Sequence, residues 1–215
     1  MEKRKLTDDD LERMRIPKRF RTAQYSAIDC TFKVKVNGEQ TELSFRDVID
    51  TYFKNLEVMF RNGVGMYCWG KNGNGKTSAA IVALKSLRQR GITAMYLEYL
   101  MIKDYVINKV SFDEYETMWQ RAMSVDVLLI DDVGKGVKDT KGTGEEFLKM
   151  ILKQRSADMK ITWMTSQISP DEFETCFGTS STSTAKECFV RVEVVGPDRR
   201  EESARQITNI FKRKP

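Results

Sequence analysis

The chain has 215 residues, of which 40% are apolar and 31% charged, so it can fill the core of one large domain. Its 36 basic and 31 acidic side chains leave a net charge of +5, which permits an anionic partner without indicating one. Because histidine is absent, an imidazole general base, an imidazole zinc ligand and a histidine pH switch are all excluded.

The first 25 residues are dense in charge and are predicted to form an arm (1–25) ahead of a domain that spans 26–215. Thr7 and the aspartates that follow it are typical of a helix start, and Pro17 ends that helix. Two interpretations of the arm stay open: a small docking helix for a partner protein, or a frayed polar terminus. The apolar residues of the docking helix would be Leu6, Leu11 and Met14.

The predicted location is the cytoplasm. The N-terminus lacks the apolar core of a signal peptide, and no apolar run approaches the length that spans a membrane. The cysteines are far apart and form no CxxC pair, which indicates reduced thiols in a cytosolic protein rather than a zinc site. They are Cys30, Cys68, Cys176 and Cys188.

A hairpin and then an alternation of strands and helices follow the arm. Residues 31–45 alternate apolar and polar side chains around Asn37-Gly38, a strong tight-turn signal, and an amphipathic helix is predicted near 45–61. Beyond it, strands separated by helices indicate a mainly parallel sheet covered on both faces. The predicted strands are 65–70, 92–100, 125–131, 160–167 and 189–196; the predicted helices are 77–91, 100–122, 145–156 and 200–214; and 178–186 is expected to be a loop.

The stretch GKNGNGKT at 70–77 has the chemistry of a phosphate cradle. Glycines let the backbone wrap so that successive N–H groups converge on an anion, and a helix start adds its positive dipole end. Lys76 supplies charge for the β and γ phosphates, and the Thr77 hydroxyl suits magnesium. The alternative, an accidental glycine-rich turn, is disfavoured because a predicted strand precedes the stretch and a predicted helix follows it. The predicted nucleotide contacts here are Gly70, Asn72, Gly73, Asn74, Gly75, Lys76, Thr77 and Ser78.

Polar side chains end two further predicted strands. The strand at 125–131 leads into Asp131 and Asp132, and ligands of open parallel sheets bind at the carboxyl ends of strands. Asp131 is therefore predicted to hold magnesium together with Thr77, and Asp132 to face the γ phosphate. Gln167 ends the next strand and is predicted to orient the attacking water, because its amide both donates and accepts hydrogen bonds. These residues predict a magnesium-dependent nucleoside triphosphate site.

The three motifs in this order resemble the AAA+ ATPases, and specifically the DnaC/IstB-like family of helicase loaders. GKNGNGKT resembles the Walker A motif, LLIDDVG (128–134) Walker B and WMTSQ (163–167) sensor 1, while IPKRF (16–20) and VEVVGPDRR (192–200) resemble loader-specific motifs. The resemblance implies an AAA+ P-loop core, α/β, with a mainly parallel five-stranded sheet sandwiched by helices and no more than a vestigial C-terminal lid. It also implies that ATP or ADP binds with Mg²⁺, with 16–20 near the adenine and Lys76, Asp131, Asp132 and Gln167 as the catalytic set.

The sequence departs from the family pattern in three places, and slow hydrolysis is expected as a result. Asp132 and Gln167 stand where AAA+ enzymes commonly carry glutamate and asparagine. The segment 183–188 contains no arginine where loaders place an arginine finger, so Lys186 or Arg191 would have to substitute. Arg199 is a predicted nucleotide contact and Arg200 a further candidate; the alternative for both is a solvated basic cluster.

The resemblance implies delivery of a replicative hexameric helicase onto single-stranded DNA during replication initiation, with self-assembly through the ATPase domain and no membrane partner. Two alternatives remain: an IstB-like ATPase partner of a DNA transposase, and a weakly hydrolysing module whose shape ATP sets. The loop at 134–144 is either nucleotide-responsive or an idle surface loop. Basic and aromatic residues before the acidic strand are candidate DNA contacts or, alternatively, packing residues: Lys103, Tyr105, Lys109, Phe112, Tyr115 and Trp119.

Overall fold

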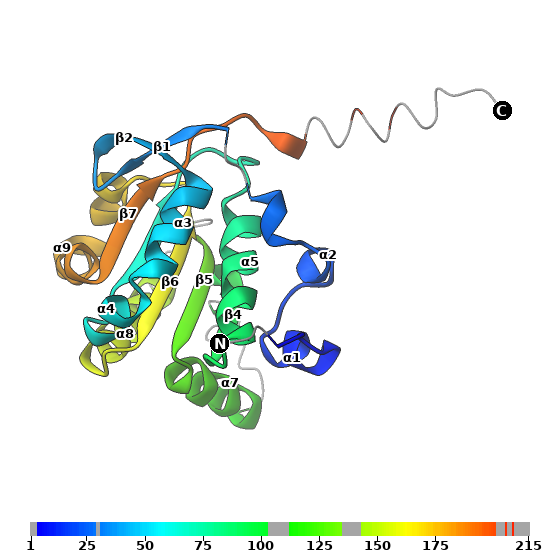
Figure 1. Cartoon of the computed structure of the whole chain (residues 1–215). Coiled ribbons are helices and arrows are strands. Elements are labelled where there is room, and N and C mark those ends of the chain that lie inside the picture. Colours follow the sequence, from blue (N-terminus) through cyan, green and yellow to red (C-terminus); the bar gives the residue numbers. More distant parts are fainter. Residues whose placement is uncertain are drawn as a thin grey trace.

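The computed structural model describes residues 4–28, 31–102, 112–134 and 143–200, together with Arg205 and Thr208; the side chains of 112–116, 143–144 and 179–186 are not described. In this part of the chain, seven strands form one sheet in the order β2-β1-β7-β3-β6-β5-β4. Helices lie on both faces of the sheet (Figure 1). This is the α/β sandwich expected from the sequence.

Five of the strands run parallel. β3 (Gly65–Trp69) pairs with β6 (Ile161–Ser166) and with β7 (Phe189–Glu193). β5 (Val127–Val133) pairs with β6 and with β4 (Ala94–Glu98). Because parallel neighbours need a crossover, a helix separates the successive strands along the chain. The predicted parallel core is confirmed.

The sheet has two strands more than the five that were predicted. β1 (Lys33–Val36) and β2 (Glu39–Ser44) form the expected hairpin around Asn37-Gly38, and β1 also pairs antiparallel with β7. An isolated hairpin is marginal in water, so pairing with β7 and burial of Val34 in the core give it the support it needs. The sheet is therefore mixed, and the hairpin is an extension of it.

Each face of the sheet carries its own apolar cluster. Along β5, Val127 and Leu129 enter one cluster, and Leu128 and Ile130 enter the other. A short apolar run buried on both sides is what a central parallel strand requires. The helices are α1 (Asp8–Arg13), α2 (Lys18–Arg21), α3 (Phe45–Lys54), α4 (Leu56–Arg61), α5 (Lys76–Gln89), α7 (Phe112–Ser124), α8 (Thr143–Ala157) and α9 (Pro170–Cys188). None of them combines the length and the apolarity needed to span a lipid bilayer.

Several of the predictions concern residues that the structure does not describe. Most of the predicted helix at 200–214, any C-terminal lid and most of the loop at 134–144 lie outside the described residues, as do Lys103, Tyr105 and Lys109 and the side chains of Phe112 and Tyr115. Trp119 is partly buried, packs against the apolar cluster and meets Phe147 edge-on at 5.8 Å, which favours its packing role. The stretch 178–186 was expected to be a loop, but its backbone is helical after a break at Gly178 in α9.

The N-terminal arm is folded against the domain. Thr7 caps α1 through a capping box, as the sequence indicated. Leu11, Met14 and Ile16 are buried in the cluster that also contains residues of α3 and α5. The backbone N–H of Tyr96 in β4 donates to the carbonyl of Met14 at 2.9 Å. Leu11 and Met14 are therefore occupied inside the molecule, and in this conformation they offer no surface for docking a partner.

Asp10 of α1 connects the arm to α5 by hydrogen bonds. Its carboxylate accepts hydrogen bonds from Arg4 at 2.6 and 2.9 Å, from Arg88 of α5 at 3.0 and 3.1 Å and from the backbone and hydroxyl of Thr7. The Arg4 guanidinium, followed by the Thr7 backbone, holds the pKa of the buried Asp10 well below its ordinary value. A carboxylate satisfied in this way stabilises the folded arm wherever it is ionised.

Replacing Asp10 with asparagine should lower the free energy of unfolding by about 1–2 kcal/mol at pH 7, because charge-assisted hydrogen bonds from two arginines are lost. A lowered carboxyl pKa contributes stability above the unfolded value near 4 and loses it as the pH falls. The difference between wild type and Asp10→Asn should therefore shrink below about pH 4, as measured by urea titrations. Asp9→Asn, in the exposed pair with Arg13, should change little. A pH-independent difference would contradict this account.

Candidate functional site

The loop 70–77 connects β3 to α5 in the strand–loop–helix arrangement that the sequence predicted. Three of its glycines have positive φ, at 141° for Gly70, 73° for Gly73 and 91° for Gly75. Glycine reaches these angles without a Cβ clash, so the backbone can turn tightly at the carboxyl edge of the sheet. Gly75 is the N-cap of α5, which places the free N–H groups of the first turn at the loop.

Lys76 lies at the centre of the loop. Its ammonium group donates to the carbonyls of Gly70 at 2.8 Å and Lys71 at 2.6 Å, and to the side-chain oxygen of Asn74 at 3.0 Å. Burial lowers the pKa of Lys76, while the charges of Asp132 and Asp131 oppose that shift. A cation is thus held inside the loop by groups that a phosphate oxygen could replace.

The Asp131 carboxylate joins four elements of the fold. Its Oδ1 accepts from the Thr77 hydroxyl at 2.8 Å and from the Thr165 hydroxyl, and its Oδ2 accepts from the Tyr96 hydroxyl at 3.0 Å. These partners come from α5, β6 and β4, while Asp131 itself is the last residue of β5 that pairs with β4. Burial raises the pKa of Asp131, and the hydrogen bonds from Thr165 and Thr77 oppose that rise.

The predicted metal pair, Thr77 and Asp131, is therefore in direct contact. A hydroxyl and a carboxylate oxygen are hard donors of the kind that Mg²⁺ prefers. Among the described residues no group of three or more acidic, cysteine or histidine side chains could hold a metal. Magnesium bound to nucleotides usually takes only one or two protein ligands and completes its shell with phosphate and water, so the pair fits that cation.

Asp132 occupies a bulge in β5. Its φ is 55°, in the left-handed region, and the pairing of β5 with β6 shifts between Ile130 and Val133. Its backbone N–H donates to the Thr165 hydroxyl at 3.2 Å. Aspartate and asparagine enter the left-handed region more readily than other non-glycine residues. The bulge thus gives a physical reason for aspartate, rather than the longer glutamate, at this position.

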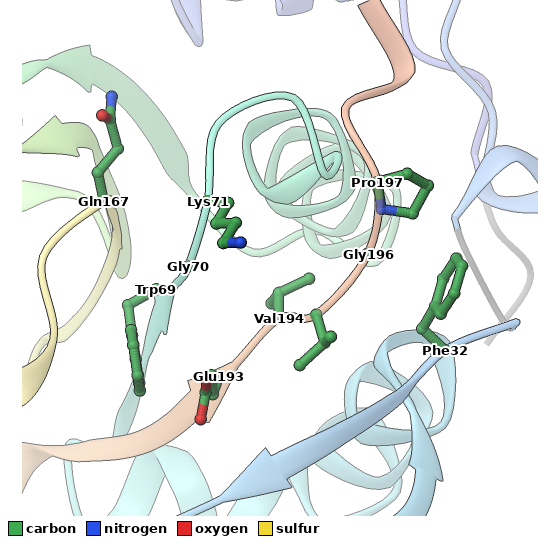
Figure 2. A pocket seen from close by; sticks show the side chains of 10 residues that line it. Phe32, Trp69, Gly70, Lys71, Gln167, Glu193, Val194, Gly196 and Pro197 are labelled. Carbon is green, nitrogen blue, oxygen red and sulfur yellow. The ribbon is translucent and has the colours of Figure 1, made fainter. Parts of the chain in front are cut away.

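Gln167 follows β6, which lies between β3 and β5, so its position in the sheet is the one predicted. The side chain is exposed and lines a cavity of about 430 Å³ beside the loop, together with Trp69, Gly70 and Lys71 (Figure 2). On the other side the cavity is lined by the segment that leaves β7 and by Phe32. Its proposed contact with the attacking water remains a prediction.

The segment 194–200, which we call the strap, runs from β7 over the loop. Val194 donates its N–H to the carbonyl of Trp69 at 2.8 Å and accepts from the Asn74 amide at 2.5 Å, and Arg199 donates its N–H to the carbonyl of Gly73 at 3.0 Å. The backbone of the strap is therefore hydrogen-bonded to the end of β3 and to Gly73 and Asn74 of the loop.

Asp198 of the strap also lies against the loop. Its carboxylate accepts from the N–H of Arg200 at 2.9 Å and occupies the space that a Cβ on Gly73 would need. The Arg199 guanidinium lies 4.0 Å from the corresponding position on Gly75, so this predicted nucleotide contact does reach the loop. Arg200 contributes to lowering the pKa of Lys76.

For the other predicted site residues, the structure gives a position but no contact that defines a role. Asn72 is exposed in the loop, and Ser78 is half-buried in the first turn of α5. Arg191 lies in the middle of β7, where its N–H donates to Asn37, and the side chain of Lys186 lies outside the described residues. Arg191 is therefore not brought to the loop.

Sequence reasoning missed Thr165, Tyr96 and Asp198. Thr165 was visible as a polar residue in an apolar strand, and it faces Asp131 once β6 is placed beside β5. Asp198 was part of a quoted motif but had no assigned contact. Tyr96 carried no signal, because a tyrosine in a buried strand is ordinarily a packing residue.

No protein-family profile matches the chain. Among curated proteins, Chromosomal replication initiator protein DnaA 2 of Protochlamydia amoebophila is 32% identical over 83 residues, which is 38% of this chain and 18% of that protein. The chain thus covers less than a fifth of the length of this relative.

Solved structures match over most of the chain. The DnaC helicase loader has a TM-score of 0.62 and 17% identity, covering 83% of this chain and 100% of that chain. A primosome component from Streptococcus pyogenes serotype M3, described as putative, has a TM-score of 0.64 and 20% identity, covering 91% and 100%. The replication initiator DnaA bound to AMPPCP and single-stranded DNA has a TM-score of 0.57 and 16% identity, covering 76% and 50%. The AAA+ P-loop fold predicted from the sequence is confirmed.

Replacing Gly73 with alanine tests the contact between strap and loop. The added Cβ should displace the Asp198 carboxylate, in addition to the strain of a left-handed φ, and should lower stability by about 1–3 kcal/mol. Gly91→Ala is the matched control, because Gly91 has φ of 87° and nothing near its Cβ position.

Denaturant titrations of Gly73→Ala, Asp198→Ala and the double variant measure the coupling. The double variant should be less destabilised than the sum of the single variants, because the clash is then absent. Additive effects, or equal costs for Gly73→Ala and Gly91→Ala, would show that Asp198 does not constrain the loop.

Proposed function

We propose that the chain is a DnaC/IstB-like AAA+ ATPase that binds a replicative DNA helicase and promotes its placement on single-stranded DNA. The carrying observation is the contact of Thr77 with Asp131 beneath the loop, at the carboxyl edge of a sheet whose fold is that of a helicase loader. The likenesses to a loader, a primosome component and a DNA-bound initiator all support a role in replication. In this proposal the arm is 1–25, the ATPase domain is 26–215, and the protein acts in the cytoplasm.

The loop residues would bind the phosphates of ATP. Lys76 would exchange the carbonyls of Gly70 and Lys71 for β- and γ-phosphate oxygens, and the N–H groups at the start of α5 would face the same anion. Arg199, held near Gly75 by the strap, would add a second cation. Thr77 and Asp131 would hold Mg²⁺, which supplies charge neutralisation on the phosphates when it is bound.

Hydrolysis would depend on Asp132 and Gln167. Asp132 would accept the proton of the attacking water, and Gln167 would orient that water. The carboxylate of aspartate reaches less far than that of glutamate, and no residue in the described part of the chain has been placed as an arginine finger. We therefore propose slow turnover, in which ATP times the assembly of a protein–DNA complex.

Lys76→Ala should weaken ATP binding by at least about tenfold, because the only lysine ammonium enclosed by the described part of the loop is removed. Fluorescence titration with a labelled ATP analogue measures the affinity. Lys71→Ala is the control, since that side chain is exposed on the same loop and should change the affinity much less. Equal affinity in Lys76→Ala and wild type would reject the phosphate site.

Asp132→Asn should retain ATP binding and lose turnover by about 10²-fold or more, the usual contribution of a general base. Asparagine tolerates the left-handed φ of this position, so the fold should be preserved. Phosphate release measures the rate, and Asp158→Asn, at the exposed turn that follows α8, is a matched neutral change. Unchanged turnover would remove Asp132 from the mechanism.

The partner can be identified with the same variant. If Asp132→Asn retains ATP, it should co-elute with a purified hexameric replicative helicase in the presence of ATP and Mg²⁺, and less so without nucleotide. Co-elution with a transposase of the same host, and not with the helicase, would instead support an IstB-like role. Binding to the helicase that is indifferent to nucleotide would favour a simple docking module.

A further inference from the structure

Thr165 lies between the two acidic residues of the site. It is 1% exposed, its hydroxyl donates to Oδ1 of Asp131, and the same hydroxyl accepts the backbone N–H of Asp132 at 3.2 Å. A threonine hydroxyl has one proton to donate and lone pairs with which to accept. The hydroxyl therefore donates a hydrogen bond to one residue of β5 and accepts one from the next.

The acceptor role follows from the bulge in β5. Between the paired positions Ile130–Met164 and Val133–Ser166, β5 advances three residues while β6 advances two. The extra residue takes its N–H out of the regular ladder, and a buried donor without a partner is costly. The Thr165 hydroxyl replaces the missing backbone acceptor and so stabilises Asp132 at its φ of 55°.

The bulge also changes where Asp132 can act. In a regular strand the side chains of Asp131 and Asp132 would point to opposite faces of the sheet. In this structure the left-handed φ of Asp132 and the register shift of β5 break that alternation. The bulge therefore releases Asp132 from the position on the opposite face that a regular strand would impose.

We propose that Thr165 is a positioning residue that sets both carboxylates together, Asp131 for the metal and Asp132 for the attacking water. The proposal rests on the proposed ATPase function. In this role Thr165 would act without touching nucleotide, metal or water; its single hydroxyl contacts the side chain of one acidic residue and the backbone of the other. Loss of this hydroxyl should therefore both raise the Mg²⁺ concentration needed for activity and lower the rate of turnover.

Tyr96 provides a contrast within the same network. In the described part of the chain its hydroxyl donates to Oδ2 of Asp131, at 3.0 Å, and not to the bulge. Tyr96→Phe should therefore raise the Mg²⁺ concentration needed for half-maximal activity, and should lower kcat at saturating Mg²⁺ less than Thr165→Val does. Thr165→Val, which keeps the shape and removes the hydroxyl, should raise that Mg²⁺ concentration and also lower kcat by about 10- to 100-fold.

The experiment compares wild type, Thr165→Val, Thr165→Ser and Tyr96→Phe by ATP turnover as a function of Mg²⁺, and by binding of a labelled ATP analogue with and without Mg²⁺. Serine restores the hydroxyl and should recover most of the activity. In the metal-free and nucleotide-free protein, the backbone amide of Asp132 should exchange its hydrogen faster in Thr165→Val than in wild type or Tyr96→Phe. Circular dichroism establishes that each variant is folded.

Wild-type kcat in Thr165→Val at saturating Mg²⁺, or failure of serine to restore what valine removes, would overturn the proposal. Unchanged exchange of the Asp132 amide would overturn it as well. If the wild type itself neither binds nor hydrolyses ATP, the proposed function fails. The amide exchange measurement still tests whether Thr165 holds the bulge, so the two failures can be told apart.

Discussion

The arrangement of the site depends on one buried carboxylate. Asp131 is 3% exposed, and a charge in that position is tolerated only when hydrogen bonds replace the lost water. Hydroxyl groups from β4, α5 and β6 supply these bonds. Because each donor is fixed on a different element, satisfying the carboxylate also fixes the first turn of α5 against three strands. The geometry of the loop follows from that constraint.

At the amino ends of the strands, a buried cation takes the place of the carboxylate. Arg155 of α8 is 1% exposed and donates to the carbonyls at the end of α7 and the starts of β5 and β6, among them Ala122 at 2.6 Å and Ile161 at 2.6 Å. Its acceptors in the described part of the chain are neutral oxygens, so the guanidinium is hydrogen-bonded to the ends of several elements at once. The sheet thus carries a structural arginine at the amino ends of its strands and the candidate site at their carboxyl ends.

Local chemistry explains why part of this molecule could be predicted. GKNGNGKT and the aspartates after an apolar strand carry their own geometric requirements, and the sequence placed Lys76, Thr77 and Asp131 correctly in one loop and one strand end. The hairpin pairing with β7, the strap over the loop and the burial of Leu11 and Met14 join residues far apart in the chain. No local pattern encodes them. The left-handed Asp132 was seen only as an unusual residue type, because a bulge depends on the pairing of two strands.

The burial of the arm has a practical consequence for shortened versions of the chain. β4 is an edge strand, and one of its N–H groups is bonded to the carbonyl of Met14. Removing residues before Ile16 would uncover the apolar face beneath α1 and free that strand to pair with another molecule. Poor solubility of such a truncation would therefore reflect edge-to-edge association, and would not by itself indicate that the arm carries the recognition of a partner.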